Sequence, residues 1–136
     1  MNRKVFGIVV LMGIAAALLS TPSCARDQEL VGLTLQPSGG FTFEGFGAQG
    51  QFTAYGSYIH PPETKDLSDK VVWTINIGNF GTVSAAGLVT YTRTDGCGSG
   101  EVVATFYSNP KNPSSGTLFT SSAPVKGAKD GTAPCL

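Results

Sequence analysis

From Leu30 onward, apolar and polar residues alternate in short runs, which is the period of extended strands. In residues 51–59, Phe52 and Ala54 fall on one face of the predicted strand and the polar side chains fall on the other. Residues 71–77 alternate in the same way, and Trp73 lies at the centre of their apolar face. Both segments are therefore predicted strands, and Trp73 is expected at the centre of the core.

Further short extended runs surround these two segments. They cover residues 30–35, 41–46, 82–91, 102–106 and 117–125. Turn-forming clusters separate them, including a loop at 60–65 whose two prolines lack the N–H groups that a strand ladder needs. With 18 glycines, 8 prolines and no long helical periodicity, the chain is predicted to be all-β, with about seven short strands in a two-sheet sandwich. The predicted core side chains are Phe52, Ala54, Val71, Trp73, Ile75, Val83 and Leu88.

The N-terminus has the composition of a bacterial secretory signal. Arg3 and Lys4 precede an uncharged apolar run, Val5 to Leu19, and small or polar residues follow it up to Ser23. A spanning helix needs roughly 20 apolar residues, and this run is shorter, which favours removal after export over a retained single-span anchor. Residues 1–23 are thus predicted to be a signal peptide.

Cys24 follows this signal directly. Its surroundings resemble the cleavage box of bacterial lipoproteins, which implies a diacylglycerol on Cys24 and a membrane anchor without a spanning helix. The box departs from the usual pattern, because Thr21 stands where leucine is common and Pro22 follows it. Ordinary cleavage after Ala25 is the alternative, and it would give a soluble periplasmic or secreted chain.

The other two cysteines, Cys97 and Cys135, form an even pair in either case. Because disulfides persist in the oxidising compartments outside the cytoplasm, a Cys97–Cys135 bridge is predicted, with two free thiols as the alternative. The bridge would close a loop of about 39 residues, which the chain-entropy model values at roughly 3 to 4 kcal/mol. It would hold an otherwise loose tail.

Length and charge set the domain organisation. Removing residues 1–23 from the 136-residue chain leaves 113 residues, which is enough for one domain. We predict a short linker at 24–30, the domain at 31–123 and a C-terminal tail at 124–136. The loss of Arg3 and Lys4 leaves 7 basic against 9 acidic residues, and this net charge of −2 does not suggest a nucleic-acid partner.

Several short motifs in this order resemble the bacterial immunoglobulin-like domains of group 2. They are Leu35-Gln36-Pro37, Asp66-Leu67-Ser68, Val71-Val72-Trp73, Gly81-Thr82-Val83-Ser84, Gly87-Leu88-Val89-Thr90 and Gly100-Glu101-Val102-Val103. The resemblance implies an immunoglobulin-like, Greek-key β-sandwich in the cell envelope, whose matched residues are structural. The chain departs from the family in a longer connection between Tyr91 and Gly100, which carries Cys97.

Residues that could carry chemistry are few. His60, the only histidine, is followed by two prolines, which favours an exposed loop residue over a catalytic base. Asp66 and Asp69 are predicted to cap a turn rather than bind a metal. Residues 95–101 lack the lysine, helix or acidic spacing of phosphate and calcium loops, so we interpret them as a flexible strand connection. No catalytic residue, metal or cofactor is predicted.

Aromatic residues offer the remaining binding candidates. Phe41, Phe43, Phe46 and Tyr58 are expected mainly in the core, whereas Tyr55 falls on the face opposite to Ala54 and is the candidate binding residue. The predicted function is that of a non-enzymatic exported module with a structural or adhesion-type protein-interaction role. The alternative is a carbohydrate-binding accessory module. The expected partner is accordingly a surface protein or a glycan.

Overall fold

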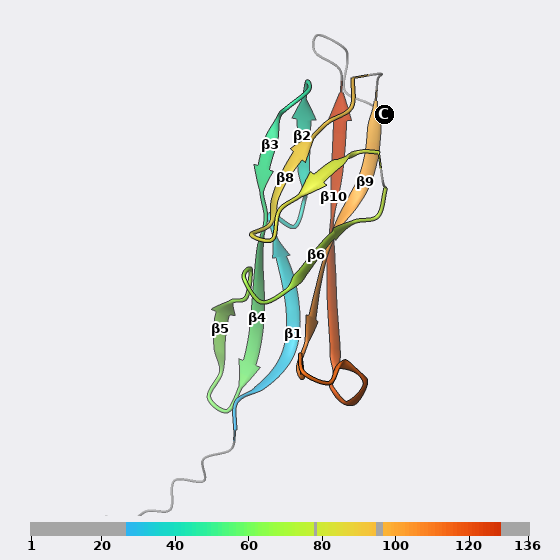
Figure 1. Cartoon of the computed structure of the whole chain (residues 1–136). Coiled ribbons are helices and arrows are strands. Elements are labelled where there is room, and N and C mark those ends of the chain that lie inside the picture. The colour runs from blue at the N-terminus through green and yellow to red at the C-terminus, as the bar shows by residue number, and fades with distance from the viewer. Residues whose placement is uncertain (1–26, 78, 95–96, 129–136) are drawn as a thin grey trace, which may run out of the picture.

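The computed structural model describes residues 27–77, 79–94 and 97–128, which form a β-sandwich (Figure 1). The all-β sandwich predicted from the sequence is thus confirmed. Within these residues the strands are β1 (Glu29–Gln36), β2 (Phe41–Glu44), β3 (Gln49–Gln51), β4 (Thr53–Ile59), β5 (Glu63–Asp66), β6 (Val72–Ile75), β7 (Gly81–Val83), β8 (Leu88–Tyr91), β9 (Gly98–Tyr107) and β10 (Leu118–Ala128), and a short 3-10 helix, η1, covers Pro113–Ser115.

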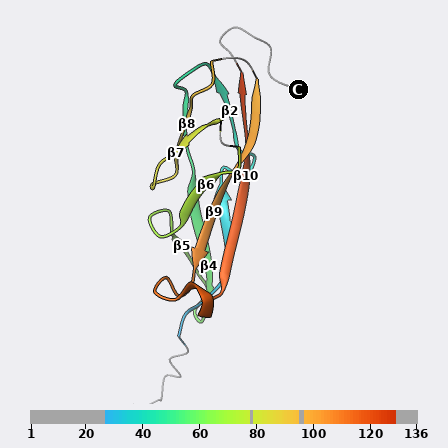
Figure 2. The same ribbon diagram turned by 45° about the vertical axis from the view of Figure 1, so that its right-hand side comes forward.

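Two layers make up the sandwich (Figures 1 and 2). One layer is a four-stranded sheet in the order β2-β10-β9-β6. The other contains two three-stranded sheets, β1-β4-β5 and β3-β8-β7. Only Phe52 separates β3 from β4, so the segment 49–59 runs through both three-stranded sheets and joins them into one layer.

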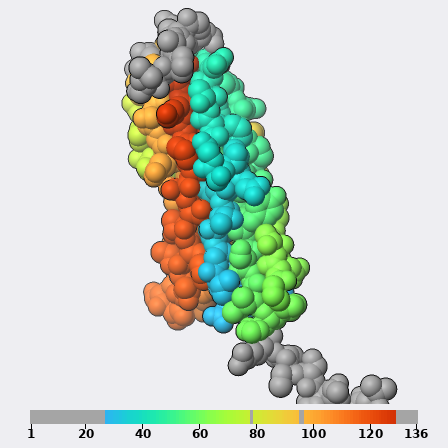
Figure 3. Space-filling model, turned by 180° about the vertical axis from the view of Figure 1, so that it is seen from behind, coloured from blue at the N-terminus to red at the C-terminus, as the bar shows by residue number. Residues whose placement is uncertain are grey.

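The first extended part of the chain contributes to both layers. β1 pairs antiparallel with β4, and after a turn at residues 37–40 β2 pairs parallel with β10 in the opposite layer. Seen from behind, β1 lies between β10 and β4 (Figure 3). This crossing closes one side of the core.

The structure has more strands than the predicted seven, for local reasons. Phe52 interrupts one predicted strand, and the segment predicted as a loop at 60–65 contains the start of β5. Pro61 and Pro62 lie in the turn before β5, so the missing N–H groups do not prevent Glu63 to Asp66 from pairing with β4.

Most of the predicted core residues are buried or packed against the core. Phe52, Ala54, Val71 and Trp73 are buried, and Ile75 and Val83 are partly buried against them. The rest of the core centres on an aromatic cluster in which the rings of Phe80 and Tyr91 lie 5.0 Å apart between centroids. Phe41 and Phe43, on β2, join this cluster through ring contacts with Phe52, Phe80 and Tyr91.

Leu88 is the exception: it is only partly buried and, unlike Ile75 and Val83, it is not among the residues packed against the core, so its prediction as a core residue is wrong. Leu88 closes a turn in which its carbonyl accepts from the Ser84 N–H at 2.9 Å. The inward positions of β8 are therefore Val89 and Tyr91, both fully buried.

The domain also extends past its predicted ends. β1 begins at Glu29, and β10 continues beyond residue 123 to Ala128, with Val125 and Ala128 buried. Gly98 to Gly100, predicted as a flexible connection, belong to β9 and pair with these last residues of β10. Pro124 is tolerated within β10 because the pairing with β2 starts only at Val125.

Candidate functional site

The turn between β5 and β6 ties the acidic candidate Asp66 to the core. Its Oδ1 atom accepts the Ser68 N–H at 2.8 Å, and hydrogen bonds from the Ser68 side chain and backbone lower the pKa of this exposed carboxyl. The Ser68 carbonyl accepts the indole N–H of Trp73 at 2.9 Å, and the Ser68 Oγ accepts the Ala54 N–H at 3.0 Å. Asp66 therefore caps a turn that fixes the core tryptophan, and this is the role predicted for it.

The other candidates for chemistry lie apart from this turn. His60 is exposed between β4 and β5, with a left-handed φ of 62°. Asp69 is exposed. Glu101, on β9, is also exposed, and its N–H donates to Oδ1 of Asn76 at 2.9 Å. Asp95 lies outside the described residues. Among the residues described, no three His, Cys, Asp or Glu side chains are grouped so that they could hold a metal ion.

Tyr55 lies on the outer face of β4, opposite the buried Ala54, and is half-exposed. Strand register places Thr34 of β1 on one side of it and Asp66 of β5 on the other. The sheet thus brings together an aromatic ring, a hydroxyl and a carboxylate on one surface, a combination that can contact a polar ligand.

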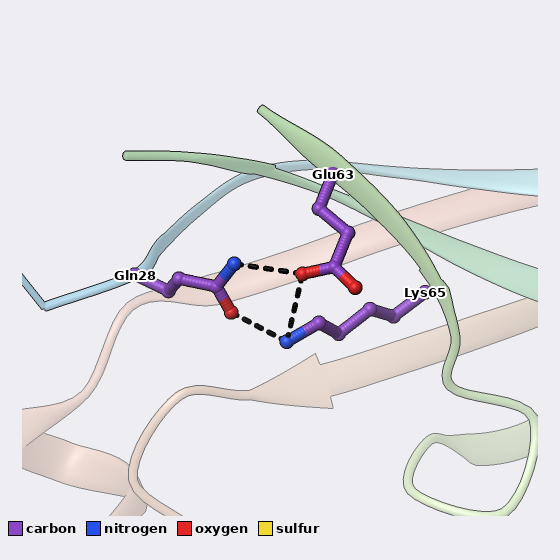
Figure 4. Close-up of polar contacts among 3 residues, drawn as sticks. All are labelled: Gln28, Glu63 and Lys65. Atoms are coloured by element: carbon purple, nitrogen blue, oxygen red, sulfur yellow. Dashed lines mark hydrogen bonds and ion pairs between the residues drawn. The ribbon is translucent and has the colours of Figure 1, made fainter. Parts of the chain in front are cut away.

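A polar cluster that the sequence did not suggest lies where the chain enters the sandwich (Figure 4). The Gln28 Nε2 donates to Glu63 at 2.8 Å, the Lys65 Nζ lies 3.2 Å from the same carboxylate, and Lys65 also donates to Gln28. The Gln28 hydrogen bond, followed by that of Lys65, lowers the pKa of Glu63. The Lys65 Nζ lies 5.0 Å from the centre of the Tyr58 ring. The cluster holds the start of β1 against β5, and its exposure limits its energetic contribution.

The turn between β2 and β3 presents Phe46 at the opposite end of the sandwich. Phe46 is 67% exposed, whereas Phe43 is buried. The N–H of Gly45 donates to the Ala128 carbonyl at 2.9 Å, and the N–H of Gly47 donates to the Tyr91 carbonyl at 2.8 Å. Backbone hydrogen bonds from both layers thus hold this aromatic side chain out in solvent, although the sequence placed it with the core or its rim.

The predicted export and anchoring residues lie mostly beyond the structure. The signal at 1–23, Cys24 and Cys135 are outside the described residues. Cys97 directly precedes β9, whose first residue, Gly98, pairs with Gly127 close to the end of β10. The disulfide therefore stays a prediction. Across the described part of the chain, no helix has the length and apolar character to span a membrane.

Comparison with known proteins adds no relative: no family model matches the chain, and no curated protein matches it. The sandwich architecture is thus established by the structure itself. The resemblance to the group 2 bacterial immunoglobulin-like domains remains a prediction.

Proposed function

We propose that this chain is a non-enzymatic, exported immunoglobulin-like module of the cell envelope that engages a partner protein through the turn carrying Phe46. The supporting observation is the position of this turn. β1 enters the sandwich at the lower end of Figure 1, and the turn between β2 and β3 lies at the upper end. A domain tethered through residues before β1 would hold Phe46 away from its point of attachment.

The way in which Phe46 is held suits it to binding. Phe46 leaves most of its ring in water, and aromatic residues are enriched among the side chains that contribute most to protein interfaces. The hydrogen bonds of Gly45 and Gly47 fix the turn before any partner arrives. Less conformational freedom is then lost on binding, which favours affinity.

The proposed location rests on the sequence of the N-terminus. We propose that Cys24 carries the lipid and that the domain belongs with the group 2 bacterial immunoglobulin-like modules, with a soluble chain beginning at Arg26 as the alternative. A Cys97–Cys135 disulfide would fasten the residues after β10 at the end of the sandwich where Phe46 lies, because Glu44 and Gly98 both pair with the last residues of β10.

Intact mass spectrometry of the protein from cells, before and after reduction and alkylation, tests this location. We expect a diacylglycerol-sized increment on a chain that begins at Cys24, with Cys97 and Cys135 protected from alkylation until reduction. A chain beginning at Arg26 would replace the anchored form with the soluble one. A chain that keeps its first 23 residues would contradict export by cleavage.

Photo-crosslinking tests the interaction. A photoreactive phenylalanine analogue at position 46 of the exported protein should give a discrete adduct with an envelope or host-surface protein. The same analogue at Leu118 is the matched control, since Leu118 is 55% exposed and lies next to the loop at the other end of the sandwich. Equal adducts at both positions, or none at 46, would contradict the proposal.

The surface around Tyr55 favours a second candidate, carbohydrate binding. Strand register places Tyr55 between Thr34 and Asp66, whose side chains could accept further hydrogen bonds from sugar hydroxyls beside their contacts with the Tyr55 carbonyl and the Ser68 N–H. If the protein binds an array of cell-surface glycans, and Tyr55→Ala abolishes this binding while Phe46→Ala does not, the carbohydrate-binding function replaces the protein-interaction one.

A further inference from the structure

β6 is an edge strand of the four-stranded sheet. It ends the sheet order β2-β10-β9-β6, so one side of its backbone has no neighbour in that sheet. Residues 71–77 (Val-Val-Trp-Thr-Ile-Asn-Ile) contain no charge, proline or glycine, and their β-branched and aromatic residues favour extended structure. Val72 is 53% exposed and Ile77 is 38% exposed, which adds apolar side chains to this open edge.

The remaining edges of the sandwich carry features that block strand addition. β5 has three charged residues in four, β3 and β7 have three residues each, β2 carries the exposed Glu44 among its four residues, and β1 is interrupted by a register shift between Leu30 and Gly32. Charge, shortness and bulges are the devices by which proteins prevent their edges from pairing with other chains. β6 is short as well, with four residues, but it has neither a charge nor a register shift, which marks its edge as a surface for pairing.

The hydrogen bonds show which backbone groups face this edge. The Asn76 N–H donates to the Glu101 carbonyl at 3.1 Å, so the backbone polar groups of Asn76 point toward β9. Thr74 and Val72 lie two and four residues before Asn76 in the ladder with β9, and their N–H and C=O groups point the same way. Because hydrogen-bonded and non-hydrogen-bonded pairs alternate between antiparallel strands, the N–H and C=O groups of Trp73 and Ile75 point away from β9.

The two flanking residues are already engaged. The Val71 N–H donates to the Leu67 carbonyl at 3.1 Å, and the Ile77 carbonyl accepts from the Phe80 N–H at 3.2 Å. Trp73 and Ile75 are therefore the residues of this edge whose N–H and C=O groups are best placed for a new strand.

We propose that β6 pairs antiparallel with β6 of a second copy of this chain, with the two-fold axis at Thr74. In this register Trp73 of each copy pairs with Ile75 of the other, which uses the N–H and C=O groups that face the edge.

This register also determines which side chains meet. Asn76 of one copy then lies beside the exposed Val72 of the other, and the two Thr74 side chains meet at the axis. No charged residue faces a like charge, because 71–77 is uncharged and Asp69 and Lys70 lie beyond the paired residues. In this register no charge opposes the pairing of the two copies, and the two four-stranded sheets become one continuous sheet.

Light scattering after size-exclusion chromatography tests the dimer with the full chain, extracted in mild detergent from the cells that export it. The wild-type protein should have twice the mass of the processed chain. The double variant Val72→Lys/Thr74→Lys should be monomeric, with dimer affinity reduced at least about tenfold, because both side chains are exposed and lysine on an edge opposes strand pairing. The control Thr120→Lys adds a charge at an exposed position of β10 in the same sheet and should remain dimeric.

A second variant gives a signal that loss of folding cannot imitate. Residues of a non-hydrogen-bonded antiparallel pair have Cα atoms about 4.5 Å apart, within the range that a disulfide spans. Thr74→Cys should therefore form a covalent dimer on a non-reducing gel, and Thr120→Cys should not. A monomeric wild-type protein, a dimer that survives Val72→Lys/Thr74→Lys, or equal cross-linking of the two cysteine variants would overturn the proposal.

Discussion

Replacing Trp73 by alanine is expected to lower the free energy of unfolding by about 3 to 5 kcal/mol. The indole is 8% exposed, and it packs so closely on Gly87 that a Cβ at that glycine would lie 2.8 Å from the ring. Alanine would leave a cavity at this contact, and the Ser68 carbonyl would lose the indole N–H that it accepts at 2.9 Å. Since domains of this size are stable by only about 5 to 15 kcal/mol, the loss should be visible as a large shift in the urea unfolding midpoint.

Val72→Ala is the matched control for this variant. It truncates the neighbouring residue of the same strand, but Val72 points outward and is 53% exposed. Its cost should stay within about 1 kcal/mol, the span of strand propensities. If the two variants unfold at the same urea concentration, Trp73 is not the centre of the core.

Alternation along the sequence predicted the inner and outer faces of the central strands because this pattern is local. Phe52 and Ala54 face inward and Tyr55 faces outward, as their spacing requires. The same logic explains the error at Leu88. Leu88 and Tyr91 are three residues apart and cannot share one face of a strand, and the turn at Ser84 to Leu88 decides which of them points inward.

Other features depend on residues that are distant in the sequence. The register shift in β1 buries both Leu30 and Leu35, although regular alternation would place them on opposite faces. Gln28 reaches Lys65 only because β1 and β5 flank β4. Phe46 was grouped with Phe43 by its apolar character, and only the hydrogen bonds of its turn to the two layers show why it stays outside.

The proposal for the edge of β6 depends on both the local sequence pattern and the arrangement of distant strands. Its lack of charge and proline is visible in the sequence, which predicts a strand with one buried apolar face at Val71 to Ile77. Its position at the end of a sheet comes from the topology alone. An uncharged apolar strand is ordinary in the middle of a sheet, and at an edge it implies a partner strand.

Gly40→Ala should cost roughly 2 to 5 kcal/mol, although it adds a single methyl group. Gly40 has a φ of +72°, a conformation that residues with a Cβ rarely adopt. A Cβ there would lie 1.6 Å from the carbonyl oxygen of Pro124, which belongs to the backbone of β10 and cannot rotate away. The variant must therefore change the turn or move β2 away from β10.

Gly39 provides the control, because a Cβ at that position has no atom within 4 Å and the residue has no positive φ. Gly39→Ala should change the free energy of unfolding by no more than about 0.5 kcal/mol, and it can stabilise slightly by restricting the unfolded chain. Hydrogen exchange of the β2 amides should rise in Gly40→Ala and stay unchanged in Gly39→Ala, since only the first disturbs the pairing of Phe41 with Val125. Equal stability of the two variants would mean that the crossing from β1 to β2 tolerates a side chain at Gly40. The parallel pairing of β2 with β10 would then not depend on the close approach of Gly40 to Pro124.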